Sequence, residues 1–224
     1  NDNILSTIFF KKIITDNIID VEFVIIEQKK KNKNYLFSVL LYKDFYIILK
    51  NYLTFLIKNE NVKSICKSNN IFFINSKKLS ENTVIDTINK SHVKNIFFIN
   101  IYNKLNINRF HKGKNFINIH LGDTNKYRGV FCLIHSIINK EKYFYITSHF
   151  IIKEFDKGKI IYQKKIKIFK ESVFNIYLNL FLKKSDVIYE SLNSIQKLKF
   201  KENKNTNKIY RPPNFLEIYI FFKS

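Results

Sequence analysis

Several residue types are absent or scarce in this sequence of 224 residues. Methionine and tryptophan do not occur, and there are four glycines, two prolines and two cysteines. Two cysteines cannot form the disulfide network that holds a small secreted scaffold together. So few glycines and prolines exclude a collagen-like or Pro/Gly-rich low-complexity chain. The missing initiator methionine indicates a fragment or a processed chain.

Apolar and basic side chains are abundant. Hydrophobic residues make up 46% of the chain, with 23 Phe and 13 Tyr, and this predicts a folded protein because their burial can offset the chain entropy. The net charge is +21, and only three of the 39 basic residues are arginines. Lysines spread over the whole chain are typical of a solvated surface and of an AT-rich genome. A basic nucleic-acid-binding module remains an alternative.

The sequence predicts a cytoplasmic protein with no membrane partner. The apolar stretch over residues 45–58 is interrupted by Lys50 and Asn51, well short of the ~20 apolar residues that a spanning helix needs. The first residues lack the basic start, apolar run and cleavage site of a signal peptide. Two unpaired cysteines, Cys66 and Cys132, fit a reducing compartment.

Short apolar runs alternate with segments of helical periodicity along the chain. The pattern predicts strands over residues 21–27, 71–75, 96–100, 115–120, 143–152 and 159–168. It predicts helices over residues 36–57, 80–90 (capped by Ser80, with Val84, Ile85 and Ile88 on one face), 130–139, 173–181 and 187–198, the last two separated by a cap at Ser185. This alternation favours an α/β fold with a mostly parallel sheet and helices on both faces.

Chemistry-bearing residues cluster between residues 118 and 158. Asn118 and His120 lie two apart at the carboxyl end of a predicted strand, so both side chains point to one face. Asp156 follows the next strand, beside Gly158. An amide can donate to an oxyanion, an imidazole can move a proton, and a carboxylate can orient the imidazole. Together they indicate an acyl-transfer site.

The run over residues 118–163 contains NIH, KYRG, INKE, TSH and DKG in that order. It resembles the central motif of the folate-dependent formyltransferases, which include glycinamide ribonucleotide transformylase, methionyl-tRNA formyltransferase and the sugar N-formyltransferases. The sequence departs from that pattern where the family has two prolines, at Leu121 and Asn125. The family's first strand would precede residue 1, so that strand is missing here or lies outside the chain.

The resemblance implies a Rossmann-like formyltransferase fold, with a catalytic domain over residues 1–200 and a tail over residues 201–224 packed on it. It implies that Asn118 stabilises the oxyanion, that His120 polarises the formyl group or relays the amine proton, and that Asp156 supports this histidine. Formyl-tetrahydrofolate would be the formyl donor, with no metal. Its expected binding residues are Tyr102, Asn103, Lys104, Leu105, Phe150, Ile152 and Asp156. The expected substrate-binding residues are His135, Lys126, Arg128 and His149.

The segment KIYRPP near residue 210 resembles the end of sugar formyltransferases, so the resemblance favours a nucleotide-linked amino sugar as the acceptor amine. A methionyl-tRNA or glycinamide ribonucleotide formyltransferase, and an inactive relative, remain alternatives, and a homodimer is left open. Arg128 could hold a backbone turn or meet a ligand anion. Cys132 is predicted to be a small buried side chain and no nucleophile.

Overall fold

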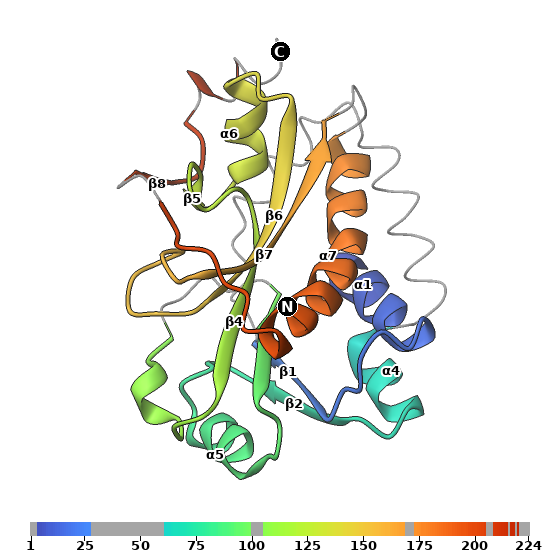
Figure 1. Ribbon diagram of the computed structural model, residues 1–224. Helices are drawn as coiled ribbons and strands as arrows, with labels where there is room; N and C mark the ends of the chain where they lie inside the picture. Colours follow the sequence, from blue (N-terminus) through green and yellow to red (C-terminus); the bar gives the residue numbers. More distant parts are fainter. Residues whose placement is uncertain are drawn as a thin grey trace. The chain divides into compact units, whose positions relative to one another are not determined.

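The computed structural model describes residues 4–27, 61–99, 105–168, 173–204, 208–214, 216, 217 and 219 (Figure 1). These residues belong to two compact units, which are described separately. The first unit lies within residues 1–91 and 170–185, and the second within residues 92–169 and 186–224. The helix predicted over residues 36–57 lies outside the described part of the chain, so the structure does not test it.

The first unit packs helices against a pair of parallel strands. Its elements are α1 (Ile4–Thr15), β1 (Phe23–Glu27), α4 (Val62–Ser68), β2 (Phe72–Ser76) and α5 (Asn82–Lys90). Strands β1 and β2 pair in parallel, and α4 contacts both α1 and β2. Four buried side chains form one core cluster of this unit: Phe10, Val62, Ile65 and Cys66. The strands predicted here from apolar runs are confirmed.

Helix α5 shows which part of a helix the sequence predicts well. Its predicted apolar face is confirmed, because Val84, Ile85 and Ile88 are buried. The predicted cap at Ser80 is wrong, since the N-cap residue is Glu81 and makes no side-chain cap bond. The Glu81 carboxylate instead accepts hydrogen bonds from backbone N–H groups of the preceding turn. The helix therefore begins one residue later than a serine cap would require.

The second unit contains a four-stranded mixed sheet and a separate two-stranded one. Its elements are β3 (Asn95–Phe98), the 3₁₀ helix η1 (Ile107–Arg109), β4 (Asn115–Leu121), β5 (Arg128–Gly129), α6 (Cys132–Ile138), β6 (Tyr143–Phe150), β7 (Ile160–Lys167) and β8 (Ile209–Tyr210). The larger sheet has the order β3-β4-β6-β7. Strand β4 runs parallel to β3, whereas β6 runs antiparallel to both β4 and β7. The predicted α/β class is confirmed.

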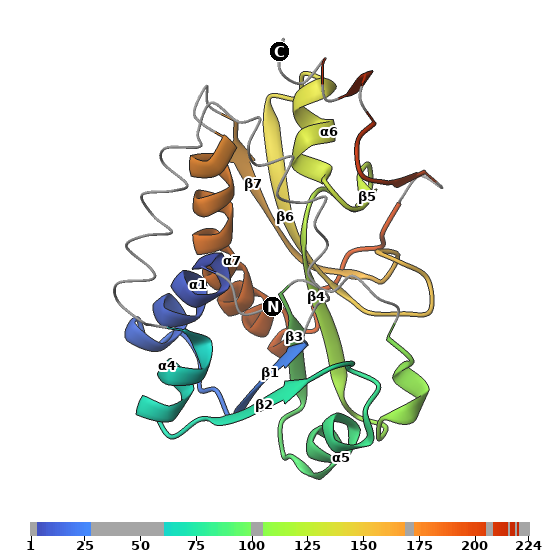
Figure 2. The same ribbon diagram turned by 180° about the vertical axis from the view of Figure 1, so that it is seen from behind.

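Strand β4 is the strand on which the candidate site is built. It lies between β3 and β6 in the sheet, and its residues 116–120 are all buried. Continuous burial is expected for a strand covered on both faces, where alternation of polar and apolar side chains is lost. Seen from either side, α6 runs alongside β6, the neighbour of β4 (Figures 1 and 2). Polar side chains on β4 therefore enter an interior rather than a solvent-facing surface.

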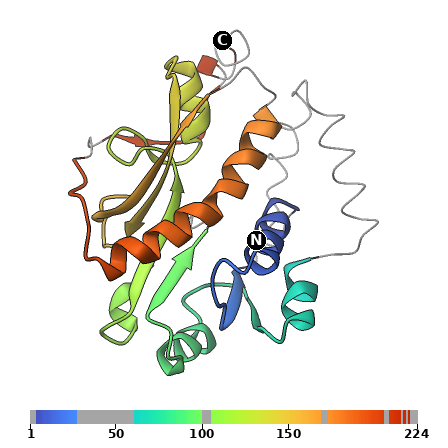
Figure 3. The ribbon, with the colours of Figure 1, turned by 45° about the vertical axis from the view of Figure 1, so that its right-hand side comes forward.

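Helix α7 (Val173–Gln196) is one continuous helix (Figure 3). The prediction of two helices separated by a cap at Ser185 is wrong. The Ser185 hydroxyl is buried and donates to the carbonyl oxygen of Leu182 in the preceding turn, so it does not interrupt the helix. Farther along, the hydroxyl of Ser191 donates to Ser148 Oγ on β6. None of the helices in the described segments is long and apolar enough to cross a membrane.

Candidate active site

Strand β4 carries two polar side chains into the interior of the second unit. Asn118 and His120 are two positions apart, so their side chains leave the strand on the same face. Only 5% and 7% of their surfaces are exposed. Buried polar side chains need hydrogen-bond partners, and here these partners come from β6, from the loop between β6 and β7, and from the segment preceding β5.

His149 on β6 faces Asn118, because the two residues are paired in the antiparallel register of β4 and β6. The Asn118 Nδ2 atom lies 3.2 Å from His149 Nε2, and His149 Nδ1 lies 2.9 Å from the carbonyl oxygen of Phe150. A carbonyl oxygen only accepts, so in the neutral ring Nδ1 carries the hydrogen and Nε2 accepts from the amide; the partners, not observed hydrogens, give this assignment. His149 therefore orients the Asn118 side chain.

Asp156 comes from the loop between β6 and β7, and its carboxylate reaches both β4 side chains. Its Oδ1 atom lies 3.3 Å from Asn118 Nδ2 and 3.4 Å from His149 Nε2. Its Oδ2 atom lies 3.8 Å from His120 Nδ1. The backbone at Asp156 is left-handed, with φ of 51°, a conformation that aspartate tolerates better than most residues do. The structure thus brings Asn118, His120 and Asp156 together.

The neighbours of Asp156 favour its ionised form. Burial alone raises the carboxyl pKa, but the charge of His120, the contact and charge of His149, and a backbone hydrogen bond outweigh burial and hold the pKa below its ordinary value. That hydrogen bond is donated by Gly129 N to Asp156 Oδ2 over 2.8 Å. When His149 takes up a second proton, its Nε2–H points at Asp156 Oδ1. A buried carboxylate so placed stabilises positive charge on either histidine.

Both ring nitrogens of His120 face oxygen atoms. Nε2 lies 2.9 Å from the carbonyl oxygen of Tyr127, to which it donates. Nδ1 faces the Asp156 carboxylate at ion-pair distance. With its one hydrogen on Nε2, the neutral ring takes up a proton at Nδ1, and the carboxylate then accepts from Nδ1–H and offsets the charge that develops. The imidazole is therefore placed to move a proton close to the amide of Asn118.

The thiol of Cys132, at the start of α6, lies against His120. Its Sγ atom is 3.4 Å from His120 Nε2. Burial, with a smaller contribution from the charge of Asp156, raises the pKa of this thiol far above its ordinary value. Because the thiolate is the nucleophilic form of cysteine, a thiol that keeps its proton is inert. The prediction that Cys132 is a small buried side chain is confirmed.

The cluster as a whole has the groups that acyl transfer requires. An amide N–H can stabilise an oxyanion, and an imidazole paired with a carboxylate can move the proton of an attacking nucleophile. In the described part of the chain, no group of three or more His, Cys, Asp or Glu side chains is arranged to hold a metal ion.

The sequence pattern of the formyl transferase family matches residues 46–189, which is more than half of the chain. The chain belongs to the formyl transferase family. The match includes the residues that form the cluster: Asn118, His120, His149 and Asp156. A search of curated proteins found no match.

Solved structures of sugar formyltransferases have a similar fold. The sugar 3N-formyl transferase WlaRD, solved in the presence of dTDP and 5-N-formyl-THF, is 23% identical, with a TM-score of 0.53 over 72% of this chain and 61% of that one. The N-formyltransferase of Helicobacter canadensis, in complex with folinic acid and dTDP-3-aminofucose, is 19% identical, with a TM-score of 0.54 over 72% and 62%. A sugar N-formyltransferase from Shewanella sp FDAARGOS_354 is 21% identical, with a TM-score of 0.50 over 69% and 67%. The predicted formyltransferase fold is confirmed, and the chain spans about three fifths of the length of the first two proteins.

In this formyl transferase, Arg128 binds a backbone turn. Its guanidinium donates from Nε and from one terminal nitrogen to the carbonyl oxygen of Phe155, over 3.0 and 2.7 Å. Only 3% of the Arg128 surface is exposed. Of the two roles that the sequence left open for Arg128, the contacts favour the structural one. Because Phe155 precedes Asp156, this arginine also fixes the loop that carries the carboxylate.

Two other residues predicted to bind substrate are bonded to groups outside the cluster. The ammonium group of Lys126 pairs with Glu141 over 3.2 Å at the surface. His135 is buried on α6, and its Nε2 lies 2.9 Å from the carbonyl oxygen of Arg211 in the C-terminal segment. Binding of substrate by Lys126 and His135 stays a prediction.

The residues predicted to bind the folate are only partly described. Tyr102, Asn103 and Lys104 lie outside the described residues, whereas Leu105 is described and half-buried. Phe150, at the end of β6, packs edge-on against Phe200, with ring centroids 5.1 Å apart. Ile152 is exposed, and Asp156 lies in the cluster. Folate binding by these residues stays a prediction.

Sequence reasoning missed two residues that contact Asp156. Gly129 donates its N–H to the carboxylate, and the Asn203 side chain donates to the backbone carbonyl of Asp156 over 2.9 Å. Gly129 ends the KYRG motif, so the sequence places it near the candidate site but does not indicate that its N–H binds Asp156. Asn203 lies in a polar, lysine- and asparagine-rich stretch, and no pattern there distinguishes it from its neighbours.

The carboxylate of Asp156 is expected to make folding sensitive to acid. Its folded-state pKa lies below the ordinary value, so its ionisation stabilises the fold above about pH 4, and this contribution is lost as the pH falls toward the folded-state pKa. Urea unfolding of the wild type and of Asp156→Asn at pH 6 and at pH 2.5 measures it. We expect the wild type to lose about 2 kcal/mol more than the variant over that range. Equal losses would contradict the low pKa.

Proposed function

We propose that this protein transfers a formyl group from formyl-tetrahydrofolate to the primary amine of a nucleotide-linked amino sugar. The observation that carries the proposal is the convergence of an amide, an imidazole and a carboxylate, with Asp156 3.3 Å from Asn118 and 3.8 Å from His120. Formyl transfer to an amine is an acyl transfer, which needs an N–H donor for the oxyanion and a base for the amine proton. Membership of the formyl transferase family supplies the reaction class.

Each of the three side chains has a distinct task in this reaction. Asn118 donates to the oxygen that becomes negative when the amine attacks the formyl carbon, and this oxygen competes with Asp156 for one amide hydrogen. His120 takes the proton that the amine loses as the new C–N bond forms, and it returns a proton to the folate nitrogen as the old C–N bond breaks. Asp156 accepts from the protonated ring and offsets its charge.

The residues of the cluster fit a formyl donor. A formyl carbonyl is activated by N–H donors, and the cluster presents the Asn118 amide and the His120 ring on one face of β4. The solved structures with dTDP or dTDP-3-aminofucose and a formyl folate support a nucleotide sugar as the acceptor. Both cysteines are buried thiols outside any disulfide, which fits a reducing cytoplasm as the site of the reaction.

Replacing His120 with asparagine is expected to lower kcat by about 10²- to 10⁴-fold, because asparagine can still hydrogen-bond but cannot carry the proton. The full chain is incubated with formyl-tetrahydrofolate and a panel of nucleotide-linked amino sugars, and the release of tetrahydrofolate is measured. The wild type should turn over at least one sugar of the panel.

The matched control is His92→Asn, which makes the same change at an exposed histidine of the second unit and should keep wild-type turnover. The role assigned to His120 is refuted if both variants turn over equally. The proposed function is refuted if the wild type releases no tetrahydrofolate with any amino sugar.

A further inference from the structure

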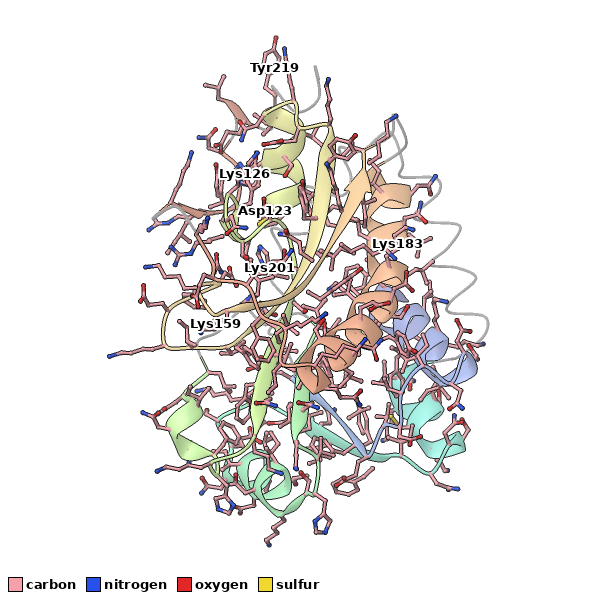
Figure 4. All side chains as sticks on the ribbon, viewed as in Figure 1. Asp123, Lys126, Lys159, Lys183, Lys201 and Tyr219 are labelled. Atoms are coloured by element: carbon pink, nitrogen blue, oxygen red, sulfur yellow. The ribbon has the colours of Figure 1, made fainter. Side chains whose placement is uncertain are left out.

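The C-terminal segment, defined here as residues 201–204 and 208–211, is bonded to the loops that form the candidate site. Lys201 exchanges two backbone hydrogen bonds of 2.8 Å with Ile160, the first residue of β7. The N–H of Lys204 donates to Asn125 Oδ1 over 2.9 Å, in the loop that follows β4. Figure 4 labels Lys159 and Lys201 on these neighbouring segments. The C-terminal segment therefore contacts the loops that follow both β4 and β6.

Within this segment, the Asn203 side chain binds the loop that carries Asp156. Its Nδ2 atom donates to the carbonyl oxygen of Asp156 over 2.9 Å and to that of Gly158 over 3.2 Å. Its Oδ1 atom is buried and has no hydrogen-bond partner among the described residues. Exchanging the oxygen and nitrogen of the Asn203 amide would place Oδ1 against the carbonyl oxygens of Asp156 and Gly158. The two donations therefore decide the orientation, even though they leave a buried acceptor unpaired.

The backbone that Asn203 binds is one that needs support. Asp156 is in the left-handed region, with φ of 51°, and a strained backbone of this kind persists only where its surroundings determine it. Asn203 holds the carbonyl on one side of this residue, and Arg128 holds the preceding carbonyl, that of Phe155.

A second route runs through Tyr210 in β8. Tyr210 pairs with Gly129 in parallel register, and its carbonyl oxygen accepts from the N–H of Val130 over 3.2 Å. Gly129 has φ of +98°, and a Cβ there would lie 2.3 Å from that same oxygen, so only glycine permits the pairing. The Tyr210 ring contacts the rings of Tyr127 and His135, with centroids 5.1 and 4.6 Å away. The N–H of Gly129, the residue that this pairing holds in place, donates to Asp156 Oδ2.

We propose that the C-terminal segment positions Asp156: Asn203 fixes its backbone carbonyl, and β8 fixes the Gly129 N–H on its carboxylate. Asn203 is a positioning residue, since it touches neither His120 nor Asn118 in the described contacts. That this positioning serves catalysis rests on the proposed function. The titratable groups that face Asp156 are His120 from β4, His149 from β6 and Cys132 from α6, and none of them is altered by a change at Asn203.

The test replaces Asn203 by leucine in the full-length chain, a change that keeps the side-chain size and removes both donors. The ¹³C carboxyl resonance of Asp156 is titrated by NMR, which needs no turnover. We expect the Asp156 pKa to rise by about one unit toward its ordinary value, because the backbone of Asp156, released from Asn203, lets the carboxylate move away from the Gly129 N–H. In assays, kcat should fall about tenfold with KM changed less than about threefold, and the acid limb of kcat should move to higher pH.

The matched control is Glu202→Gln, at the adjacent residue, whose well-exposed carboxylate forms an ion pair with Lys159. It should titrate and turn over as the wild type does. An unchanged Asp156 titration in folded Asn203→Leu would overturn the proposal. If Asn203→Leu does not fold, the same titration is carried out on Asn203→Ser, which retains one donor. A smaller upward shift of the Asp156 pKa is then expected. An unchanged Asp156 pKa in Asn203→Ser would overturn the proposal. A wild type without turnover would refute the proposed function, while the titration would still decide whether the segment positions Asp156.

Discussion

Asp156→Asn is expected to lower kcat about 10³-fold at neutral pH, because proton transfer by a correctly oriented imidazole contributes a factor of this size. The variant keeps the shape of the side chain, and the amide oxygen can still accept from Gly129 N, which now donates to Asp156 Oδ2 over 2.8 Å. It loses the negative charge that faces His120 Nδ1 at 3.8 Å and His149 Nε2 at 3.4 Å. Neither imidazole then has a counter-charge when it takes up a proton. Release of tetrahydrofolate from formyl-tetrahydrofolate measures the effect.

The control for this variant is Asp86→Asn, at an exposed position on α5, which should keep wild-type kcat. The near-ultraviolet circular dichroism spectra of both variants should match that of the wild type, which would show that both variants fold. A kcat of Asp156→Asn within about threefold of the wild type would remove Asp156 from the mechanism.

Gly158→Ala is expected to destabilise the protein by about 3 kcal/mol or more, the largest stability effect that we predict. A Cβ at this position would lie 1.7 Å from the carbonyl oxygen of Phe150 and 2.7 Å from its carbonyl carbon, so the backbone itself would have to move. This contact closes the loop between β6 and β7, where Phe150 N donates to the carbonyl oxygen of Lys159 over 3.1 Å. Urea unfolding at pH 7 gives the loss in free energy.

Gly113→Ala is the matched control, because Gly113 has a left-handed backbone with φ of +96° but no neighbouring atom within 4 Å of the added Cβ. It should cost only about 1 kcal/mol, which is the strain of an alanine in that conformation. If Gly158→Ala lost no more free energy than Gly113→Ala, the close approach of Gly158 to Phe150 would not be the cause of a large loss.

Much of the fold follows from apolar periodicity, because burial of one face decides where most of these elements form. The stripe of Val84, Ile85 and Ile88 predicts the buried face of α5, which is confirmed. The predictions of N-cap residues were wrong where tertiary packing overrides the local preference of serine for a helix N-terminus. Ser185 has the side chain of a good N-cap, yet it lies buried inside α7 next to Lys184, which is also fully buried. Burial lowers the pKa of Lys184 to about 7. The local sequence does not predict this burial, because the lysine lies in a stretch of polar residues.

The candidate site was predictable to the extent that its residues share a strand or a recognisable motif. The spacing of Asn118 and His120 predicts their common face, since strand side chains alternate with a period of two. The approach of Asp156 follows from the family resemblance and not from spacing. Asn203 could not be found, because it acts through a backbone carbonyl of another loop, and such a contact leaves no trace in local sequence.

The left-handed backbone at Asp156 also limits how this position can change during evolution. A single nucleotide change in an aspartate codon yields asparagine, glycine, histidine, tyrosine, alanine, valine or glutamate. Asparagine and glycine adopt this backbone readily but carry no charge, whereas glutamate keeps the charge but is disfavoured in this conformation and has a longer side chain. No single mutational step therefore preserves both properties, and a lineage that loses this aspartate has no gradual route to a substitute at the same position.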